Sequence, residues 1–237
     1  MSLDYKKEFY KYALKEHKLN DKQLSNFFYQ QNIDCFNNSS TPYITEERKV
    51  NLSQMDIFSR LMMDRIIFIG ESISSYVANI VQAQLLFLQS LDRKSDICIY
   101  INSPGGSIYA GLGIYDTMQY VEPNISTICT GFSASISAVL LCAGNKGKRF
   151  SLKHSRIMLH QPNGYYTGQA SDILISAKQI MKLKEEIYHI ISQHSNQDIK
   201  TIKRYLNRDY WITSEEAIKF GIIDKILIKN NRINFEK

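Results

Sequence analysis

The sequence lacks any long apolar segment. No apolar run approaches the roughly 18 residues that a membrane-spanning helix needs. The N-terminal stretch MSLDYKKEFYKYALKEHK also has no apolar core of the kind found in secretory signals. These absences argue against a helical membrane protein and against export. We therefore expect a soluble, cytoplasmic protein that has no membrane partner.

The sequence also lacks paired cysteines. Its four cysteines form no C-x-x-C pair, and three of them lie in apolar stretches, where cysteine packs as a small hydrophobic residue. This pattern predicts free thiols in a reducing compartment and no bound metal. The cysteines are Cys35, Cys98, Cys129 and Cys142.

Charge of one sign is not concentrated in one segment. The 237 residues include 29 basic and 23 acidic side chains, which give a net charge of +6 and a pI near 9.0. Because both signs are mixed along most of the chain, we interpret the charge as solvated surface and expect no nucleic-acid partner. The hydrophobic content of 44% is enough to form the core of one domain.

Composition divides the chain near residue 50. Residues 1–50 are rich in Lys, Asn, Gln and Tyr and predict an N-terminal arm, with a short amphipathic helix over Glu8–Lys18 and an irregular linker over Asn32–Pro42. We favour a partly mobile arm over a folded functional element, because terminal segments become ordered only when other contacts hold them. Residues 51–237 predict one domain, since no internal repeat is present.

Short β-branched runs alternate with helical stretches from Arg65 onward. This alternation predicts βαβ units around a largely parallel sheet, and hence an α/β fold. The predicted strands are RIIFIG, ICIYIN, ISTICT, RIMLH and IIDKILI. The predicted helices cover Tyr76–Leu91, Ser107–Tyr120, Gln169–Gln193 and Ser214–Lys219.

Two glycines follow the predicted strand ICIYIN. In Asn102-Ser-Pro-Gly-Gly106 they allow backbone N–H groups to approach a ligand closely, so the turn can bind an anion. An ordinary strand-to-helix turn explains the same residues, because Gly-Gly commonly ends an element. The motif alone does not decide between the two interpretations.

Three serines lie where the strand ISTICT turns into an apolar helix. Ser133, Ser135 and Ser137 all fall in GFSASISA, near a helix N-terminus whose unpaired N–H groups can stabilise an oxyanion. This position suits a nucleophile, although a serine at a helix start is more often a cap or a small packing residue. Spacing does not choose among the three.

A serine nucleophile needs a base, and the base needs a third group to orient it. Of the five histidines, only His160 ends an apolar strand and leads into a loop with proline and glycine, from which its side chain can enter a cleft. A histidine packed in the core is the alternative. Asp209, in NRDYW, follows a helix and taken alone is an ordinary surface or capping carboxylate.

Several separate motifs resemble one family. INSPGGS, GFSASISAVLLCAG, RIMLHQP, GQASDI and RDYWITSEEA occur in the order found in ClpP, the proteolytic subunit of the Clp protease, over about residues 60–227. The resemblance implies a ClpP/crotonase-like α/β fold, with repeated βαβ units and a protruding strand–helix handle that begins near Gly168. It also implies a serine endopeptidase that degrades unfolded proteins.

The resemblance assigns roles to the candidate residues. Ser135 would be the nucleophile, His160 the base and Asp209 the third member of a triad, with the family's separations of 25 and 49 residues. The backbone N–H groups of Gly106 and Ile136 would form the oxyanion hole, which gives the glycine turn a function.

The resemblance further implies an assembly. Family members form two stacked seven-membered rings that a hexameric AAA+ unfoldase such as ClpX, ClpA or ClpC supplies with unfolded polypeptides. The chain has no P-loop, so ATP would be used by the partner and no cofactor is expected here. Residues 1–50 would line the axial pore or be removed as a propeptide. The family's docking pocket for the ATPase would involve Tyr100, Tyr120 and Leu227, with Cys98 in place of a frequent aromatic residue, although core packing explains each of them as well.

Three features depart from the family pattern. Ser133 and Ser137 replace small residues beside the nucleophile, and their hydroxyls can hydrogen-bond locally. Asn207 stands where an acidic residue often precedes Arg208 in the pair that bridges the rings and couples assembly to the active site. Its neutral amide lacks the strength of a charge-assisted bond. The loop NGYYTG has fewer glycines than usual, but no departure removes a triad member.

Two other functions compete with the protease. A crotonase-like acyl-CoA enzyme uses a related sheet and paired N–H groups, but it does not need all three triad residues at these separations. A scaffold subunit would join a ring without cutting, and such a subunit normally loses Ser, His or Asp, which are all present here.

Overall fold

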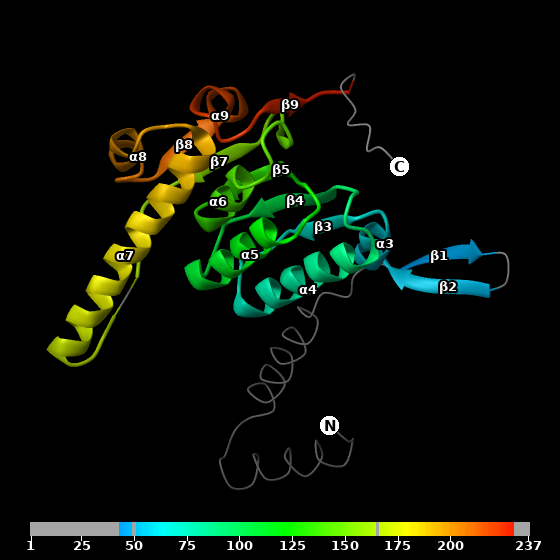
Figure 1. Ribbon diagram of the computed structural model, residues 1–237, viewed down its shortest axis with the longest axis horizontal. Helices are drawn as coiled ribbons and strands as arrows, with labels where there is room; N and C mark the ends of the chain where they lie inside the picture. Colours follow the sequence, from blue (N-terminus) through cyan, green and yellow to red (C-terminus); the bar gives the residue numbers. More distant parts are fainter. Residues whose placement is uncertain (1–42, 49–50, 165, 230–237) are drawn as a thin grey trace, which may run out of the picture. The chain divides into compact units, whose positions relative to one another are not determined.

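The computed structural model describes residues 43–48, 51–164 and 166–229 (Figure 1). The chain divides into two compact units, residues 1–57 and 58–237. The predicted N-terminal helix, the predicted linker and Cys35 lie outside the described residues.

The described part of the first unit is a β-hairpin. Strands β1 (Tyr43–Arg48) and β2 (Asn51–Asp56) pair antiparallel, with Tyr43 opposite Asp56 and Arg48 opposite Asn51. The sequence analysis did not predict this hairpin, because its short strands consist largely of polar residues and give a weak apolar pattern.

The second unit is built on a seven-stranded sheet. Five parallel strands follow the order β3-β4-β5-β6-β9, while β7 pairs parallel with β5 and antiparallel with β8. Strand β5 is long enough to have two neighbours on one edge. The strands are β3 (Ile66–Ile69), β4 (Ile97–Ser103), β5 (Ile125–Ala134), β6 (Arg149–Leu152), β7 (Arg156–Leu159), β8 (Tyr210–Thr213) and β9 (Lys225–Leu227).

Seven helices occur in the described residues, and most begin at a side chain that caps free N–H groups. Ser74, Ser107 and Asp198 each accept a hydrogen bond from the N–H three residues later, and Thr213 forms a capping box with Glu216. The predicted helices and the largely parallel α/β sheet are confirmed. The helices are α3 (Ile57–Met63), α4 (Ser75–Leu91), α5 (Ile108–Tyr120), α6 (Ile136–Cys142), α7 (Ala170–Ser195), α8 (Ile199–Tyr205) and α9 (Ser214–Phe220).

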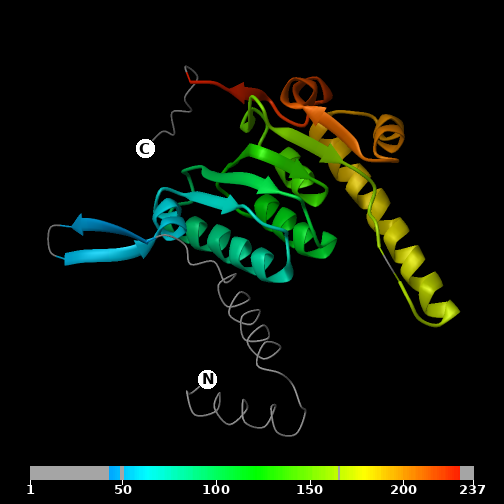
Figure 2. The same cartoon turned by 180° about the vertical axis from the view of Figure 1, so that it is seen from behind.

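Alternate residues of the sheet face its two sides. On β4, Ile97, Ile99 and Ile101 belong to the main core with apolar residues of α4, α5 and α6, and α6 is buried along its whole length. Cys98 and Tyr100 point to the opposite side and pack with residues of β5, β6 and β9. Figure 2 shows this opposite side, with β3 and β4 in front of α4 and α5.

The three described cysteines are free thiols, as predicted. Burial is the main cause that raises the pKa of the Cys129 thiol to about 11, and that of the Cys98 and Cys142 thiols to about 12. These thiols are therefore protonated at neutral pH and act as packing groups.

Helix α7 is the helical part of the predicted handle and extends beyond the sheet (Figures 1 and 2). Its C-terminal half contributes Leu183, Ile187 and Ile191 to the buried residues, whereas its N-terminal half is largely exposed. In the described part of residues 161–169 no strand is assigned. A strand is defined by hydrogen bonds to a neighbouring strand, and no other strand of the described chain pairs with this segment.

A buried ion pair joins β6 to the start of β9. The Arg149 side chain is only 4% exposed, and it donates to both carboxylate oxygens of Asp224, at 2.7 and 3.0 Å. The guanidinium also donates to the backbone oxygen of His194 near the end of α7. Burial tends to raise the pKa of Asp224, but hydrogen bonds from Arg149 and its positive charge outweigh burial, so the pKa lies below its usual value.

We expect Asp224→Asn to lower the free energy of unfolding by about 3 kcal/mol or more, because the change leaves the buried Arg149 guanidinium without a counter-charge. Chemical denaturation at pH 7 and a fixed protein concentration measures this loss. Because the folded-state pKa of Asp224 is depressed, the advantage of the unmodified protein is complete above the unfolded-state pKa of about 4 and decreases as the pH falls below it.

The matched control is Arg93→Gln, which removes an exposed ion pair with Glu122. The Arg93 and Glu122 side chains are 69% and 59% exposed. This change should cost less than about 1 kcal/mol. Equal losses in the two variants would show that burial of Arg149 and Asp224 does not matter.

Candidate active site

Ser135 lies in a sharp turn between β5 and α6. Its backbone angles, φ 59° and ψ −129°, belong to a region that non-glycine residues rarely adopt, at a cost of about 1–3 kcal/mol. The Ser135 N–H donates to the backbone oxygen of Met158 in β7 at 2.8 Å. The turn is therefore held by the neighbouring strand, and the serine side chain reaches His160, the residue that follows this strand.

Geometry separates the three serines that spacing left open. Ser133 and Ser137 are completely buried, and their hydroxyls hydrogen-bond to each other at 3.3 Å. The Ser135 Oγ instead lies 2.9 Å from Nε2 of His160. Among the three, Ser135 alone is placed for a histidine to receive its proton.

The antiparallel pair β7–β8 brings His160 and Asp209 together. Leu159, the last residue of β7, is opposite Tyr210, the first residue of β8. The next residue on one strand and the preceding residue on the other therefore face each other, and His160 Nδ1 lies 3.2 Å from Asp209 Oδ1. A carboxylate at Nδ1 favours the tautomer that leaves Nε2 free to accept a proton from Ser135.

The two side chains differ in exposure. His160 is 19% exposed, whereas Asp209 is 65% exposed and borders on solvent. The imidazole is thus held between the serine and the carboxylate, and water screens only the outer side of Asp209.

The glycine turn packs directly against the serine turn. A Cβ atom on Gly105 would lie 2.5 Å from the backbone oxygen of Ala134 and 2.8 Å from Cβ of Ser135, so no other residue fits there. Gly105 also has a φ of 88°, which favours glycine. The two segments that contain the candidate oxyanion donors, residues 105–106 and 135–136, are therefore in contact.

The two candidate oxyanion donors are not used by the secondary structure next to them. The parallel bridge between Ile73 and Gly106 uses the Gly105 carbonyl and the Ser107 N–H, which leaves the Gly106 N–H out of this bridge. Ile136 is the first residue of α6, so its N–H has no acceptor within the helix. Their role as an oxyanion hole stays a prediction.

A hollow opens beside the Ser135 and His160 side chains. Its other lining residues are apolar, so it suits an apolar side chain of a ligand. They are Ile108, Ile136, Val139, Leu159, Pro162 and Ile187.

The described residues contain no group of three metal-ligating side chains, and none of their helices is long and apolar enough to cross a membrane.

The structure brings together two of the three predicted docking residues. Tyr100 and Leu227 both pack against the small apolar cluster that includes Cys98, on the sheet side opposite the main core. Tyr120, at the end of α5, is 76% exposed and is not part of that cluster.

The predicted coupling residues lie beside the triad. Asn207 and Arg208 are exposed and immediately precede Asp209. The Asn207 backbone oxygen accepts a hydrogen bond from the Gln161 side chain at 2.8 Å. Inter-ring contact of Asn207 and Arg208 stays a prediction.

Sequence reasoning missed Gln161. Its N–H donates to the backbone oxygen of Leu206 and its side-chain amide donates to that of Asn207, both at 2.8 Å. Lys184 in α7 in turn donates to the Gln161 side-chain oxygen at 2.8 Å. Gln161 thus holds the Asp209 loop, and its position directly after His160 is the signal that could have indicated it.

The arrangement can perform nucleophilic acyl transfer, because it combines a serine hydroxyl, an imidazole and a carboxylate in one chain of contacts.

Comparisons with known proteins point to a particular class. The sequence profile described as Clp protease matches residues 48–230. The chain belongs to the Clp protease family.

Curated relatives cover most of the chain. The ATP-dependent Clp protease proteolytic subunit of Porphyromonas gingivalis strain W83 is 53% identical over 225 residues, which are 95% of this chain and 99% of the relative. The proteins of the same description from Bacteroides thetaiotaomicron and Bacteroides fragilis strain NCTC 9343 are each 59% identical over 188 residues, 79% of this chain. Those matches cover 86% and 91% of the two relatives.

We expect Gly105→Ala to lower kcat/KM for a small peptide by roughly a hundredfold or more, because the added methyl displaces the Ala134 carbonyl and with it the serine turn. The control is Gly147→Ala. Gly147 has nearly the same φ, 87°, but nothing lies within 4 Å of its Cβ position. Both variants carry the same backbone strain, so only the contact with the serine turn distinguishes them. Equal activity in the two variants would contradict the prediction.

Proposed function

We propose that this chain is a serine endopeptidase, the proteolytic subunit of an ATP-dependent Clp protease, with Ser135, His160 and Asp209 as its catalytic triad. The observation that carries the proposal is the chain of contacts from Ser135 Oγ to His160 Nε2, at 2.9 Å, and from His160 Nδ1 to Asp209 Oδ1, at 3.2 Å. The names of the curated relatives support the same activity.

The reaction proceeds through an acyl-enzyme. Ser135 Oγ attacks the peptide carbonyl carbon while its proton moves to His160 Nε2, and the N–H groups of Gly106 and Ile136 stabilise the oxyanion. The tetrahedral intermediate then breaks its C–N bond, and His160 gives its proton to the leaving amine. Water then attacks the ester carbonyl carbon while His160 takes its proton. As the ester C–O bond breaks, His160 returns that proton to Ser135 Oγ, which restores the serine and releases the carboxyl product. Asp209 holds the imidazole and stabilises its charged form.

The hollow indicates which substrate side chain binds, and the relatives' names together with this sequence indicate where ATP is hydrolysed. The apolar hollow beside Ser135 supports binding of an apolar side chain next to the scissile bond. The relatives are described as ATP-dependent, and this sequence has no P-loop. We therefore assign ATP hydrolysis to a partner, a hexameric AAA+ unfoldase such as ClpX, ClpA or ClpC in the cytoplasm. The Tyr100–Leu227 face, with exposed Tyr120, is the proposed docking surface.

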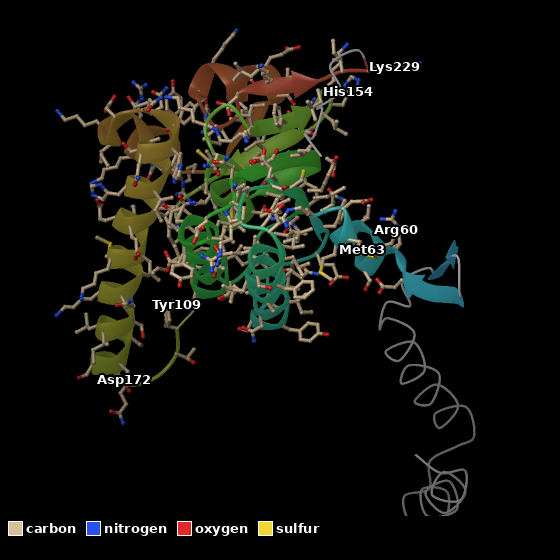
Figure 3. The ribbon with its side chains drawn as sticks, turned by 45° about the vertical axis from the view of Figure 1, so that its right-hand side comes forward. Arg60, Met63, Tyr109, His154, Asp172 and Lys229 are labelled. Atoms are coloured by element: carbon tan, nitrogen blue, oxygen red, sulfur yellow. The ribbon has the colours of Figure 1, made fainter. Side chains whose placement is uncertain are left out.

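Self-association into two stacked seven-membered rings completes the proposal. Its support is the number of large apolar side chains in solvent on two helices, which a monomer rarely leaves uncovered. Figure 3 shows Asp172 near the end of α7 that lies farthest from the sheet, and the apolar residues of α7 follow it. The exposed residues are Tyr76, Ile80, Leu86, Phe87 and Leu91 on α4 and Ile173, Leu174, Ile175 and Met181 on α7.

Covalent labelling tests the triad. We expect a fluorophosphonate to modify the assembled protein at Ser135, located by mass spectrometry of its peptides, because the Ser135 hydroxyl contacts the His160 imidazole. Ser135→Ala should prevent labelling and lower kcat by roughly four powers of ten or more. An adduct on Ser133 or Ser137, or activity retained in Ser135→Ala, would refute the assignment.

Native mass measurement tests the assembly. We expect a particle of about fourteen subunits, since symmetric closed rings bury the exposed faces of both helices. Leu174→Lys, on the exposed half of α7, should reduce the particle to single rings of about half that mass, because it places a charge in the ring-to-ring contact. The control is Lys178→Arg on the same helix, which keeps the charge. A monomer in all conditions would contradict the proposal.

A further inference from the structure

Ser137 makes an unusually complete set of hydrogen bonds. It lies in the first turn of α6, two residues after Ser135, and none of its surface is exposed. Its Oγ accepts from the Ala134 N–H at 2.8 Å and from the Ser133 hydroxyl at 3.3 Å. It also lies 2.8 Å from the backbone oxygens of Ser103 and Ala134, and its single proton can be donated to one of them at a time. One donated and two accepted bonds use the full capacity of a hydroxyl.

These bonds join the ends of two strands. Ser103 is the last residue of β4 and Ala134 is the last residue of β5, and the pairing of the two strands shifts register between Ile101 and Ser103. At this point the Ser137 hydroxyl stands between the N–H of Ala134 and the carbonyl of Ser103. A side chain therefore bridges the two strands at the point where their pairing shifts register.

The bridged strand ends lead directly into the two halves of the proposed oxyanion hole. Ser103 begins the turn that contains Gly105 and Gly106, and its own hydroxyl accepts from the Gly105 N–H at 3.1 Å. Its hydroxyl also donates to the Glu71 backbone oxygen at 2.6 Å, which ties the same turn to the segment after β3. On the other side, Ala134 immediately precedes Ser135 and Ile136.

We propose that Ser137 is a positioning residue for peptide hydrolysis, whose hydroxyl sets the spacing between the Gly106 and Ile136 donors. This proposal rests on the proposed function, in which Ser135 is the nucleophile and the two N–H groups stabilise the oxyanion. Ser137 does not touch the substrate. It acts through the Ala134 peptide, whose carbonyl abuts Gly105 and whose neighbour is the strained Ser135.

The proposal predicts which kinetic constant changes. The oxyanion forms only in the transition state, so a change in donor spacing lowers kcat while substrate binding stays nearly constant. We expect Ser137→Ala to lower kcat for a fluorogenic peptide by roughly tenfold to a hundredfold, less than the loss of a whole oxyanion donor, with KM changed by less than about twofold. A variant that only loosens the core would not separate the two constants in this way.

A peptide aldehyde supplies the second measurement. The Ser135 hydroxyl adds across its C=O bond to form a hemiacetal, whose oxygen occupies the oxyanion site. Ser137→Ala should weaken inhibition by the aldehyde by about the same factor as kcat, and should leave binding of the corresponding product peptide unchanged. If aldehyde inhibition and product-peptide binding weaken by the same factor, the proposal is overturned.

Two further variants make the test decisive. Ser137→Cys keeps the shape of the side chain but replaces the hydroxyl by a somewhat larger thiol that hydrogen-bonds weakly, so it should show the same loss of kcat even if Ser137→Ala fails to fold. The matched control is Ser214→Ala, which removes an equally buried hydroxyl from the first turn of α9, where it donates to the Leu152 backbone oxygen. Its kcat and aldehyde inhibition should remain as in the unmodified protein.

The outcomes distinguish failure of the Ser137 proposal from failure of the proposed function. If Ser135→Ala still hydrolyses peptide or still forms the hemiacetal, the proposed function fails. If Ser135→Ala is inactive but Ser137→Cys matches Ser214→Ala in kcat and in aldehyde inhibition, only the role of Ser137 fails.

Discussion

The hydrogen bond from the Ser135 N–H to the Met158 backbone oxygen holds the candidate site together. It ends the ladder in which β5 pairs with β6 through Thr127–Cys129 and then with β7 through Phe132–Ala134. Because β5 changes partner in this way, the serine turn begins beside the strand that leads to His160. The same strand pairs with β8, and that register sets Asp209 against the imidazole. One strand, β7, therefore positions all three side chains.

The strain at Ser135 is offset by contacts on every side of its turn. The Met158 oxygen accepts its N–H, the Ser137 hydroxyl holds the preceding peptide, and Gly105 packs against the Ala134 carbonyl. Each of these contacts is made by a buried group, so the conformation is over-determined and does not relax. Such a turn keeps the Ser135 hydroxyl near His160 before a substrate binds. The serine side chain therefore needs less reorganisation during the reaction.

Sequence reasoning recovered what depends on local pattern and missed what depends on register. The helices α4, α5, α7 and α9 follow from their apolar periodicity, and His160 follows from its place after an apolar strand. The choice of Ser135 over Ser133 and Ser137 needs the burial of the other two, and Asp209 needs the β7–β8 register. Family resemblance, not pattern, supplied those two residues in advance. Strands β6 and β8 were missed because each has only four residues and neither contains a run of β-branched apolar residues.

The exposure of Asp209 links the proposed assembly to the chemistry. In the single chain, water screens a carboxylate that is 65% exposed, and this weakens its attraction for the imidazolium that forms during the reaction. Asn207 and Arg208 are its exposed neighbours, and Gln161 connects their loop to Lys184 on α7. A contact that covers this loop and the exposed half of α7 would exclude water from Asp209 and strengthen its interaction with His160. The proposed ring-to-ring contact would therefore act on the same hydrogen bond that orients the proposed base, and assembly and activity would depend on one physical interaction.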